Sequence, residues 1–191
     1  MRAQKGEAGY IRTRKYHLTA EIAFSFAVVI GLVITGYIQT KTRLNWLTLV
    51  AVLGCLPACR LLVNLIMLIP HHSVNEAREL EISGNTEYLT VVYDLVITSE
   101  RRSMPITALV ISGNTVCGYA PDKKVDVAYA ARHIKSILKQ NSIEKVTVKV
   151  FHDYVAFLSR AEGLNSIAAV EGDDNSQQEE AIREIILDIS L

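Results

Sequence analysis

The sequence predicts an α+β protein in which a two-helix transmembrane hairpin precedes a folded domain. Three observations support this: two long apolar runs lie between residues 18 and 69, β-branched segments follow from residue 88, and helical segments alternate with them. Half of the 191 residues are hydrophobic, which excludes a disordered chain. We expect a basic segment over 1–17, the hairpin over 18–72 and the domain over 73–191.

The first apolar run, residues 18–38, has Glu21 as its single charged residue and is long enough to cross a bilayer core of about 30 Å. The second run, residues 44–69, contains Pro57, Arg60 and Asn64, so we expect its later turns to leave the hydrocarbon region. A signal peptide is the alternative for the first run. The length of that run, its lack of a clear cleavage site and the second run close behind it favour an uncleaved anchor.

The charges of the chain cancel in total but are unevenly distributed. Residues 1–72 hold eight Lys/Arg and two Asp/Glu, a net charge of +6, whereas residues 73–191 hold twelve and eighteen, a net charge of −6. The acidic domain would repel a polyanion, so nucleic acid is not the expected partner. We expect the basic amino-terminal segment to contact anionic lipid headgroups.

Flanking cations predict the orientation of the hairpin. Five precede the first run and two lie in the short connection: Arg2, Lys5, Arg12, Arg14 and Lys15, against Lys41 and Arg43. This excess predicts that the amino terminus and the domain lie on the cytoplasmic side of a bacterial inner membrane and that the connection lies outside. The three cysteines, Cys55, Cys59 and Cys117, suggest no disulfide framework, in agreement with a reducing compartment.

Two features of the hairpin suggest interactions inside the membrane. If the turn is centred near residue 40 or 41, Glu21 and Arg60 lie at equal depth and are expected to pair, or each side chain reaches the interface separately. Small residues form a stripe that predicts close helix packing, either within the hairpin or against a second copy. Its members are Ala23, Ala27, Gly31 and Thr35 in the first run, facing in the second run either Gly54 and Ala58 or Ala51, Cys55 and Cys59.

The domain is predicted to have the order helix, three strands, helix, strand, helix, helix. The pattern Ser73-Val74-Asn75-Glu76 predicts a capped helix to about residue 82, and the terminal helix follows a second such pattern, Ser176 to Glu179. We expect an antiparallel three-strand meander and a fourth strand parallel to the third. The other ranges are strands over 88–98, 106–111, 115–119 and 145–151, and helices over 125–139 and 154–161, the last stopped by Gly163.

Most chemical motifs in the chain favour a structural interpretation. Adjacent His71 and His72 do not converge on one metal ion, and Asp153 after His152 is explained as a helix cap rather than as half of an acid–base dyad. Cys55 and Cys59 fit small-residue packing better than metal binding. We therefore expect no catalytic residue, no metal and no cofactor.

The stretch from Asp94 to Leu138 resembles the nuclease-related domains of the restriction-endonuclease-like superfamily, found behind bacterial membrane spans. That resemblance implies an acidic residue on the second strand and a Glu-x-Lys on the third, which together hold magnesium. Here the second strand offers Thr107 and Ala108, and the third offers Gly118, Tyr119 and Ala120. Asp94, Asp122 and Lys123 are the nearest candidate polar cluster, so the resemblance implies an inactive member.

The whole chain, including residues 5–11 (KGEAGYI) and 111–119 (ISGNTVCGY), resembles small two-span membrane proteins of anaerobic Firmicutes, some labelled glycosyltransferase-like. The sequence has no D-x-D and no nucleotide-sugar motif. We therefore expect a membrane-anchored, non-enzymatic protein whose cytoplasmic domain binds another protein or itself. A membrane-tethered enzyme is the alternative.

Overall fold

The computed structural model describes residues 4–40, 46–99, 102–171 and 176–191. The predicted connection at 41–45, the first two residues of the polar turn predicted over 100–103 and most of the linker predicted over 172–176 lie outside the described residues. The chain forms two compact units, one of residues 11–72 and one of residues 1–10 together with 73–191. The basic segment expected over 1–17 is thus divided between them.

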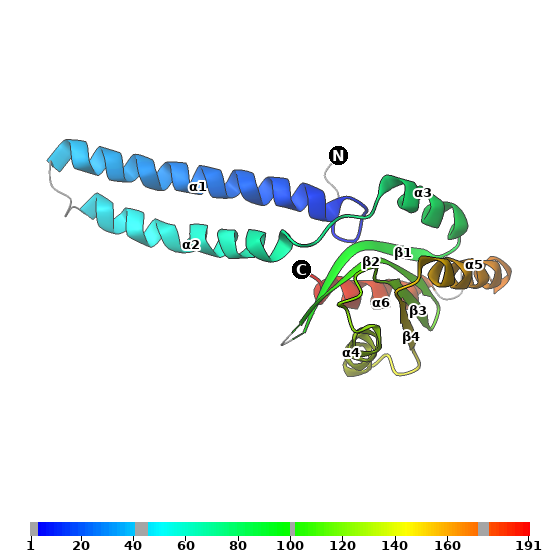
Figure 1. The fold of residues 1–191 in the computed structure, drawn as a ribbon. Helices are drawn as coiled ribbons and strands as arrows, with labels where there is room; N and C mark the ends of the chain where they lie inside the picture. The colour runs from blue at the N-terminus through cyan, green and yellow to red at the C-terminus, as the bar shows by residue number, and fades with distance from the viewer. Residues whose placement is uncertain (1–3, 41–45, 100–101, 172–175) are drawn as a thin grey trace. The chain divides into compact units, whose positions relative to one another are not determined.

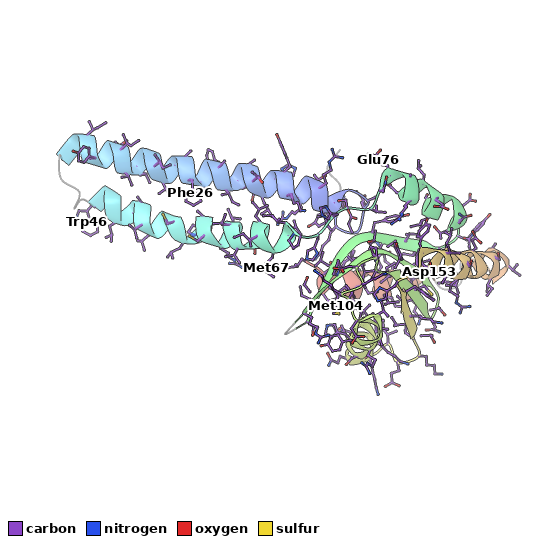
Figure 2. All side chains as sticks on the ribbon, viewed as in Figure 1. Phe26, Trp46, Met67, Glu76, Met104 and Asp153 are labelled. Carbon is purple, nitrogen blue, oxygen red and sulfur yellow. The ribbon has the colours of Figure 1, made fainter. Side chains whose placement is uncertain are left out.

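The first unit is a pair of long apolar helices, α1 (Tyr10–Thr40) and α2 (Trp46–Leu68) (Figure 1). Both are long and apolar enough to cross a membrane, and only 11% of each apolar window is buried. Large apolar side chains such as Trp46 and Met67 are exposed (Figure 2). A helix of the core of a water-soluble protein would bury such residues. Pro57 lies inside α2 without ending it.

In the hairpin, α1 begins eight residues before the predicted apolar run and buries Leu18 and Ile22. Helix α2 buries Ala51 and Ala58, one heptad apart. Where the chain leaves α2, the Lys15 ammonium group donates to the carbonyl oxygens of Ile69 at 2.8 Å and His71 at 2.5 Å. These bonds join the first turns of α1 to the segment that follows α2.

The second unit is an α+β domain around a four-stranded mixed sheet. Strands β1 and β2 and strands β2 and β3 are antiparallel, and β4 lies parallel to β3, in the order β1-β2-β3-β4. This agrees with the expected meander and parallel pair. The elements are α3 (Glu76–Asn85), β1 (Thr90–Ser99), β2 (Arg102–Ser112), β3 (Thr115–Tyr119), α4 (Val127–Gln140), β4 (Thr147–Phe151), α5 (Tyr154–Glu171) and α6 (Ser176–Asp188).

Each face of the sheet has its own apolar core. One core joins the sheet to α4 and α6 through residues such as Ile106, Ile134 and Ile186, all fully buried. The other joins it to α3 and α5 through Ile82 and Phe157. The domain therefore has three layers, with two helices on each face of the sheet.

Several element boundaries differ from the sequence-based expectation, and α3, expected to end near residue 82, continues through Ser83 and Gly84 to Asn85. Helix α5 continues through Gly163, which was expected to stop it, because Leu164 beyond the glycine is buried in the core under α5. Strand β2 begins four residues earlier than expected and includes Pro105. Helix α3 is capped by Asn75, whose side chain accepts from the backbone of Ala77, instead of by Ser73. In α5, the burial of Leu164 therefore outweighs the local cost of Gly163 in a helix.

Candidate functional site

The most informative local geometry lies at the edge strand β1, which binds residues of the segments before α1 and after α2. The backbone N–H of Tyr93 donates to the carbonyl oxygen of Gly6 at 2.8 Å. At the next residue, the Asp94 carboxylate accepts from the backbone N–H of Val74 at 2.8 Å. We call these four residues, Gly6, Val74, Tyr93 and Asp94, the anchor junction.

Gly6 fits the anchor junction for two physical reasons. Its φ of +93° lies in the left-handed region, which side-chain-bearing residues rarely adopt. A Cβ atom at this position would also lie 2.9 Å from side-chain carbons of both Val92 and Leu187. The segment before α1 is therefore packed into the domain that follows α2.

Asp94 occupies an unusual position for a carboxylate. It is 3% exposed and has a φ of 54° inside a strand. Val92 and Leu95, on either side of Asp94, both face the core beneath α4 and α6, so the usual alternation of side chains shifts by one residue here. This backbone distortion directs the Asp94 side chain to the incoming chain at Val74.

The carboxyl terminus covers another part of the same edge. The backbone N–H of Thr98 donates to the carbonyl oxygen of Ile189, and the backbone N–H of Leu191 donates to that of Val96 at 3.0 Å. The Lys5 ammonium group donates to the carbonyl oxygen of Ser190 at 2.7 Å. Both chain ends thus contact β1, and this contact reduces the exposure of an edge strand.

The candidate cluster of Asp94, Asp122 and Lys123 takes separate structural roles. Asp122 is exposed, and its carboxylate accepts from the backbone N–H of Lys124 at 2.9 Å, as in an Asx turn. Lys123 is exposed in the same turn, whereas Asp94 is buried at the anchor junction. Across the described ranges, no group of three His, Cys, Asp or Glu residues has the geometry to hold a metal ion.

A cavity of about 780 Å³ lies between α4 and the ends of β1 and β2. Ser99 and Tyr129 share a hydroxyl hydrogen bond of 2.7 Å there, and the guanidinium carbon of Arg102 lies 5.8 Å from the centre of the Tyr129 ring. His133 stacks on Tyr129, and its buried Nε2 has no hydrogen-bond partner among the described residues. Thr98, Asp126 and Ile137 complete the lining.

A second polar group lies on the opposite face, between α3 and α5. The Arg78 guanidinium lies over the rings of both Tyr119 and Tyr154, and the Tyr154 hydroxyl donates to Glu81 at 2.7 Å. Burial, the hydrogen bond to Glu81 and its charge all raise the pKa of Tyr154. Burial, followed by the charge of Glu79, raises the pKa of Tyr93 to about 12. These hydroxyls stay protonated at neutral pH and are poor general bases.

Of the interactions predicted within the hairpin, the structure contains the packing of the small residues of α2 but no ion pair between Glu21 and Arg60 in its described residues. Gly54 lies against Val29 of α1, and Ala58 is fully buried, so the small residues of α2 are at the contact between the helices. The small residues of α1, which are Ala23, Ala27 and Gly31, are exposed. Glu21 and Arg60 are also exposed, and no ion pair joins them in the described hairpin. Their pairing in a bilayer stays a prediction, as does contact of the α1 stripe with a second copy.

The other candidate residues from the sequence are His71, His72, His152, Asp153 and the three cysteines. Asp153 caps α5 by accepting from the backbone of Val155, and His152 contacts the carbonyl oxygen of Ala120 at 2.9 Å. Cys117 is buried in the sheet. Cys55 and Cys59 lie on α2, and His71 and His72 lie between α2 and α3.

Sequence reasoning missed the anchor junction because its partners are far apart in the chain. The single local signal is a pair of glycines, Gly6 and Gly9, in an otherwise cationic segment. Comparison with protein-family models, curated proteins and solved structures gives no match for this chain. The fold itself defines the class, an α+β domain whose chain is interrupted by an apolar helical hairpin over residues 11–72.

Proposed function

We propose that the chain is a membrane-anchored, non-enzymatic protein whose α+β domain is held at the cytoplasmic face as an interaction or regulatory module. The observation that carries the proposal is the anchor junction. There, the segment before α1 and the segment after α2 bind consecutive residues of one strand, Tyr93 and Asp94.

The anchor junction supports a hairpin with both ends on the same side of the membrane. Residues before and after the two apolar helices belong to one folded unit, so the chain between them crosses a bilayer an even number of times. Cleavage of α1 as a signal peptide would remove Gly6, whose site is formed by Val92 and Leu187. The packing of Gly6 therefore favours an uncleaved anchor.

The cytoplasmic orientation is supported by the cations that flank α1. Arg12 and Arg14 lie in its first turns, and Lys15 donates to carbonyl oxygens at the far end of the hairpin. An excess of cations on this side, against two in the connection, is typical of the cytoplasmic side of a bacterial inner membrane. Anionic headgroups near Arg12 and Arg14 would add about 1 kcal/mol per cation.

The non-enzymatic assignment is supported by the roles of the domain's carboxylates. Asp94, Asp122 and Asp153 each accept a hydrogen bond from a backbone N–H, so their geometry is explained without a substrate. The alternatives are a membrane-tethered enzyme and an inactive relative of the restriction-endonuclease-like nucleases, and the mixed sheet between helical layers agrees with the second of these. In that case, Thr107 and Ala108 on β2 replace the required acid.

Cysteine labelling tests the proposed topology. Single cysteines replace Gln4, Lys123 and Thr42 in a chain whose three native cysteines are changed to alanine, and intact bacterial cells are treated with a membrane-impermeant maleimide. We expect labelling of the Thr42→Cys chain only, with Gln4→Cys and Lys123→Cys labelled after permeabilisation. Different labelling of Gln4→Cys and Lys123→Cys would contradict the shared side, and external labelling of both would reverse the orientation.

A photo-crosslinking residue on the exposed surface of the domain tests the proposed activity. We expect discrete cross-linked products with a cytoplasmic protein in native membranes. Magnesium-dependent cleavage of DNA or RNA by the purified full chain would instead establish the enzymatic alternative.

A further inference from the structure

The two edges of the sheet differ in their coverage. Residues from both chain ends contact β1 at Tyr93, Val96 and Thr98. Strand β4 is the other edge, and no strand in the described part of the chain pairs with its outer side. The two edges are three strand spacings apart, about 14 Å. The β4 edge therefore lies across the sheet from the anchor junction (Figure 1).

The backbone of β4 presents hydrogen-bonding groups to this open side. The N–H of Thr147 donates to Asn114, and the carbonyl oxygen of Phe151 accepts from Ala120, so these odd-numbered residues of β4 bond towards β3. Because the direction alternates along a strand, the N–H and C=O groups of Val148 and Val150 point away from β3. A further strand has an existing row of donors and acceptors to bind.

The segment that contains this edge differs in charge from the rest of the domain. Residues 121–151 hold seven Lys/Arg and three Asp/Glu, a net charge of +4, whereas the rest of 73–191 holds five and fifteen, a net charge of −10. All seven cations are exposed. They are Lys123, Lys124, Arg132, Lys135, Lys139, Lys145 and Lys149.

Cations lie beside the β4 edge on both faces of the sheet. Asp126, Tyr129 and His133 place one flank of α4 at the cavity beside β1 and β2. At 100° per residue, Lys135 and Lys139 project from the opposite flank, towards β4. On the other face, Arg160 and Lys149 are close enough to the Cys117 thiol to lower its pKa, against the larger rise that burial causes.

We propose that β4 is a docking edge that binds an extended acidic segment of a partner protein as a fifth strand. Backbone hydrogen bonds to Val148 and Val150 supply the strand geometry, and the surrounding lysines and Arg160 select acidic side chains. The same lysines repel the β4 edge of a second copy, which reduces edge-to-edge aggregation. This inference deepens the proposed interaction function by naming its surface and partner chemistry.

Binding of defined fluorescent peptides to the full chain in neutral detergent tests the proposal. The probe is a seven-residue peptide of alternating Glu and Val, compared with its Lys–Val counterpart and with an acidic peptide whose central Val is Pro. We expect binding of the alternating acidic peptide at least tenfold tighter than of either control. Equal binding of the proline peptide, or tighter binding of a single-stranded oligonucleotide, would overturn strand addition.

Variants of the protein locate the binding edge. Lys149→Glu is expected to weaken binding of the acidic peptide at least tenfold, whereas Arg183→Glu on α6, with the same change in charge, leaves it unchanged. Val148→Pro removes an outward N–H without breaking a backbone bond to β3 and should abolish binding, and circular dichroism checks that the variant folds despite the change in its partly buried side chain. Equal effects of Lys149→Glu and Arg183→Glu would overturn the assignment to β4. Cysteine labelling is independent of the peptide, so failure of the proposed topology is distinguishable from failure of this site.

Discussion

The carboxylate of Asp94 accepts a hydrogen bond from the backbone N–H of Val74 at 2.8 Å, and it does so from a left-handed residue within a strand. This bond fixes the point at which the chain leaves the apolar hairpin and enters the domain. It also explains why a buried carboxylate is placed where the side-chain alternation of β1 shifts.

Replacing Asp94 tests the strength of this junction. Asp94→Ala removes the acceptor for the buried N–H of Val74 and leaves a Cβ-bearing residue at positive φ, so we expect a loss of about 1–3 kcal/mol in the free energy of unfolding. Asp94→Asn keeps an acceptor oxygen and tolerates the left-handed region, so it should lose less. Chemical denaturation of the full chain in detergent measures both, and equal losses would contradict the hydrogen-bond explanation.

Alanine variants of the two glycines before α1 distinguish the cost of backbone strain from the cost of steric contact. Gly6 and Gly9 both have positive φ, of +93° and +80°, but a Cβ atom contacts Val92 and Leu187 only at Gly6. Gly9→Ala is expected to cost about 1 kcal/mol from strain alone. Gly6→Ala should cost about 1–3 kcal/mol more because the buried side chain of Val92 and the partly buried side chain of Leu187 must move. Thermal unfolding of the two variants measures the difference, and equal melting temperatures would show that the segment is not packed as described.

Glu179 joins the terminal helix to the sheet. Its two carboxylate oxygens accept from the backbone N–H of Gly113 at 2.6 Å and from the hydroxyl of Thr90 at 2.8 Å. We expect Glu179→Ala to lower the free energy of unfolding by about 1.5–3 kcal/mol, the range for hydrogen bonds to charged groups. Glu180→Ala is the matched control, because the exposed pair of Glu180 with Arg183 contributes about 0–1 kcal/mol. A similar loss in both variants would contradict the role of Glu179.

The tyrosine hydroxyls predict how stability changes at high pH. The pKa of Tyr93 is about 12 in the folded protein and about 10 in an unfolded chain. The folded state binds the hydroxyl proton of Tyr93 more tightly than the unfolded chain does. The stability that Tyr93 contributes is therefore complete below about pH 10 and is lost as the pH rises towards 12. Tyr93→Phe should flatten this decline in the free energy of unfolding. Tyr154→Phe should remove the part of the decline that comes from the Tyr154 hydroxyl. Unfolding measured from about pH 9 to pH 12, with absorbance of tyrosinate, checks both, and an unchanged slope in Tyr93→Phe would contradict the assignment.

Much of the fold was predictable because its signals are local. Apolar runs of sufficient length indicate the two long helices, and β-branched segments between turn residues indicate the strands, including Thr115–Tyr119 at its observed bounds. Errors arose where distant packing decides a local outcome. Helix α5 passes Gly163 because Leu164 is buried beyond it, and β2 extends over Pro105 because β1 pairs with it there.

By itself, the sequence determined the composition of the two parts: an apolar, cationic hairpin and an acidic α+β domain with their element order. Only the tertiary structure decided that Gly6 and Val74 bond to the neighbouring residues Tyr93 and Asp94, and that no strand of the described residues lies beyond β4. The physical reason is sequence separation. Periodicity and capping report interactions within a few residues, whereas the bond from Tyr93 to Gly6 closes a loop that contains the whole hairpin.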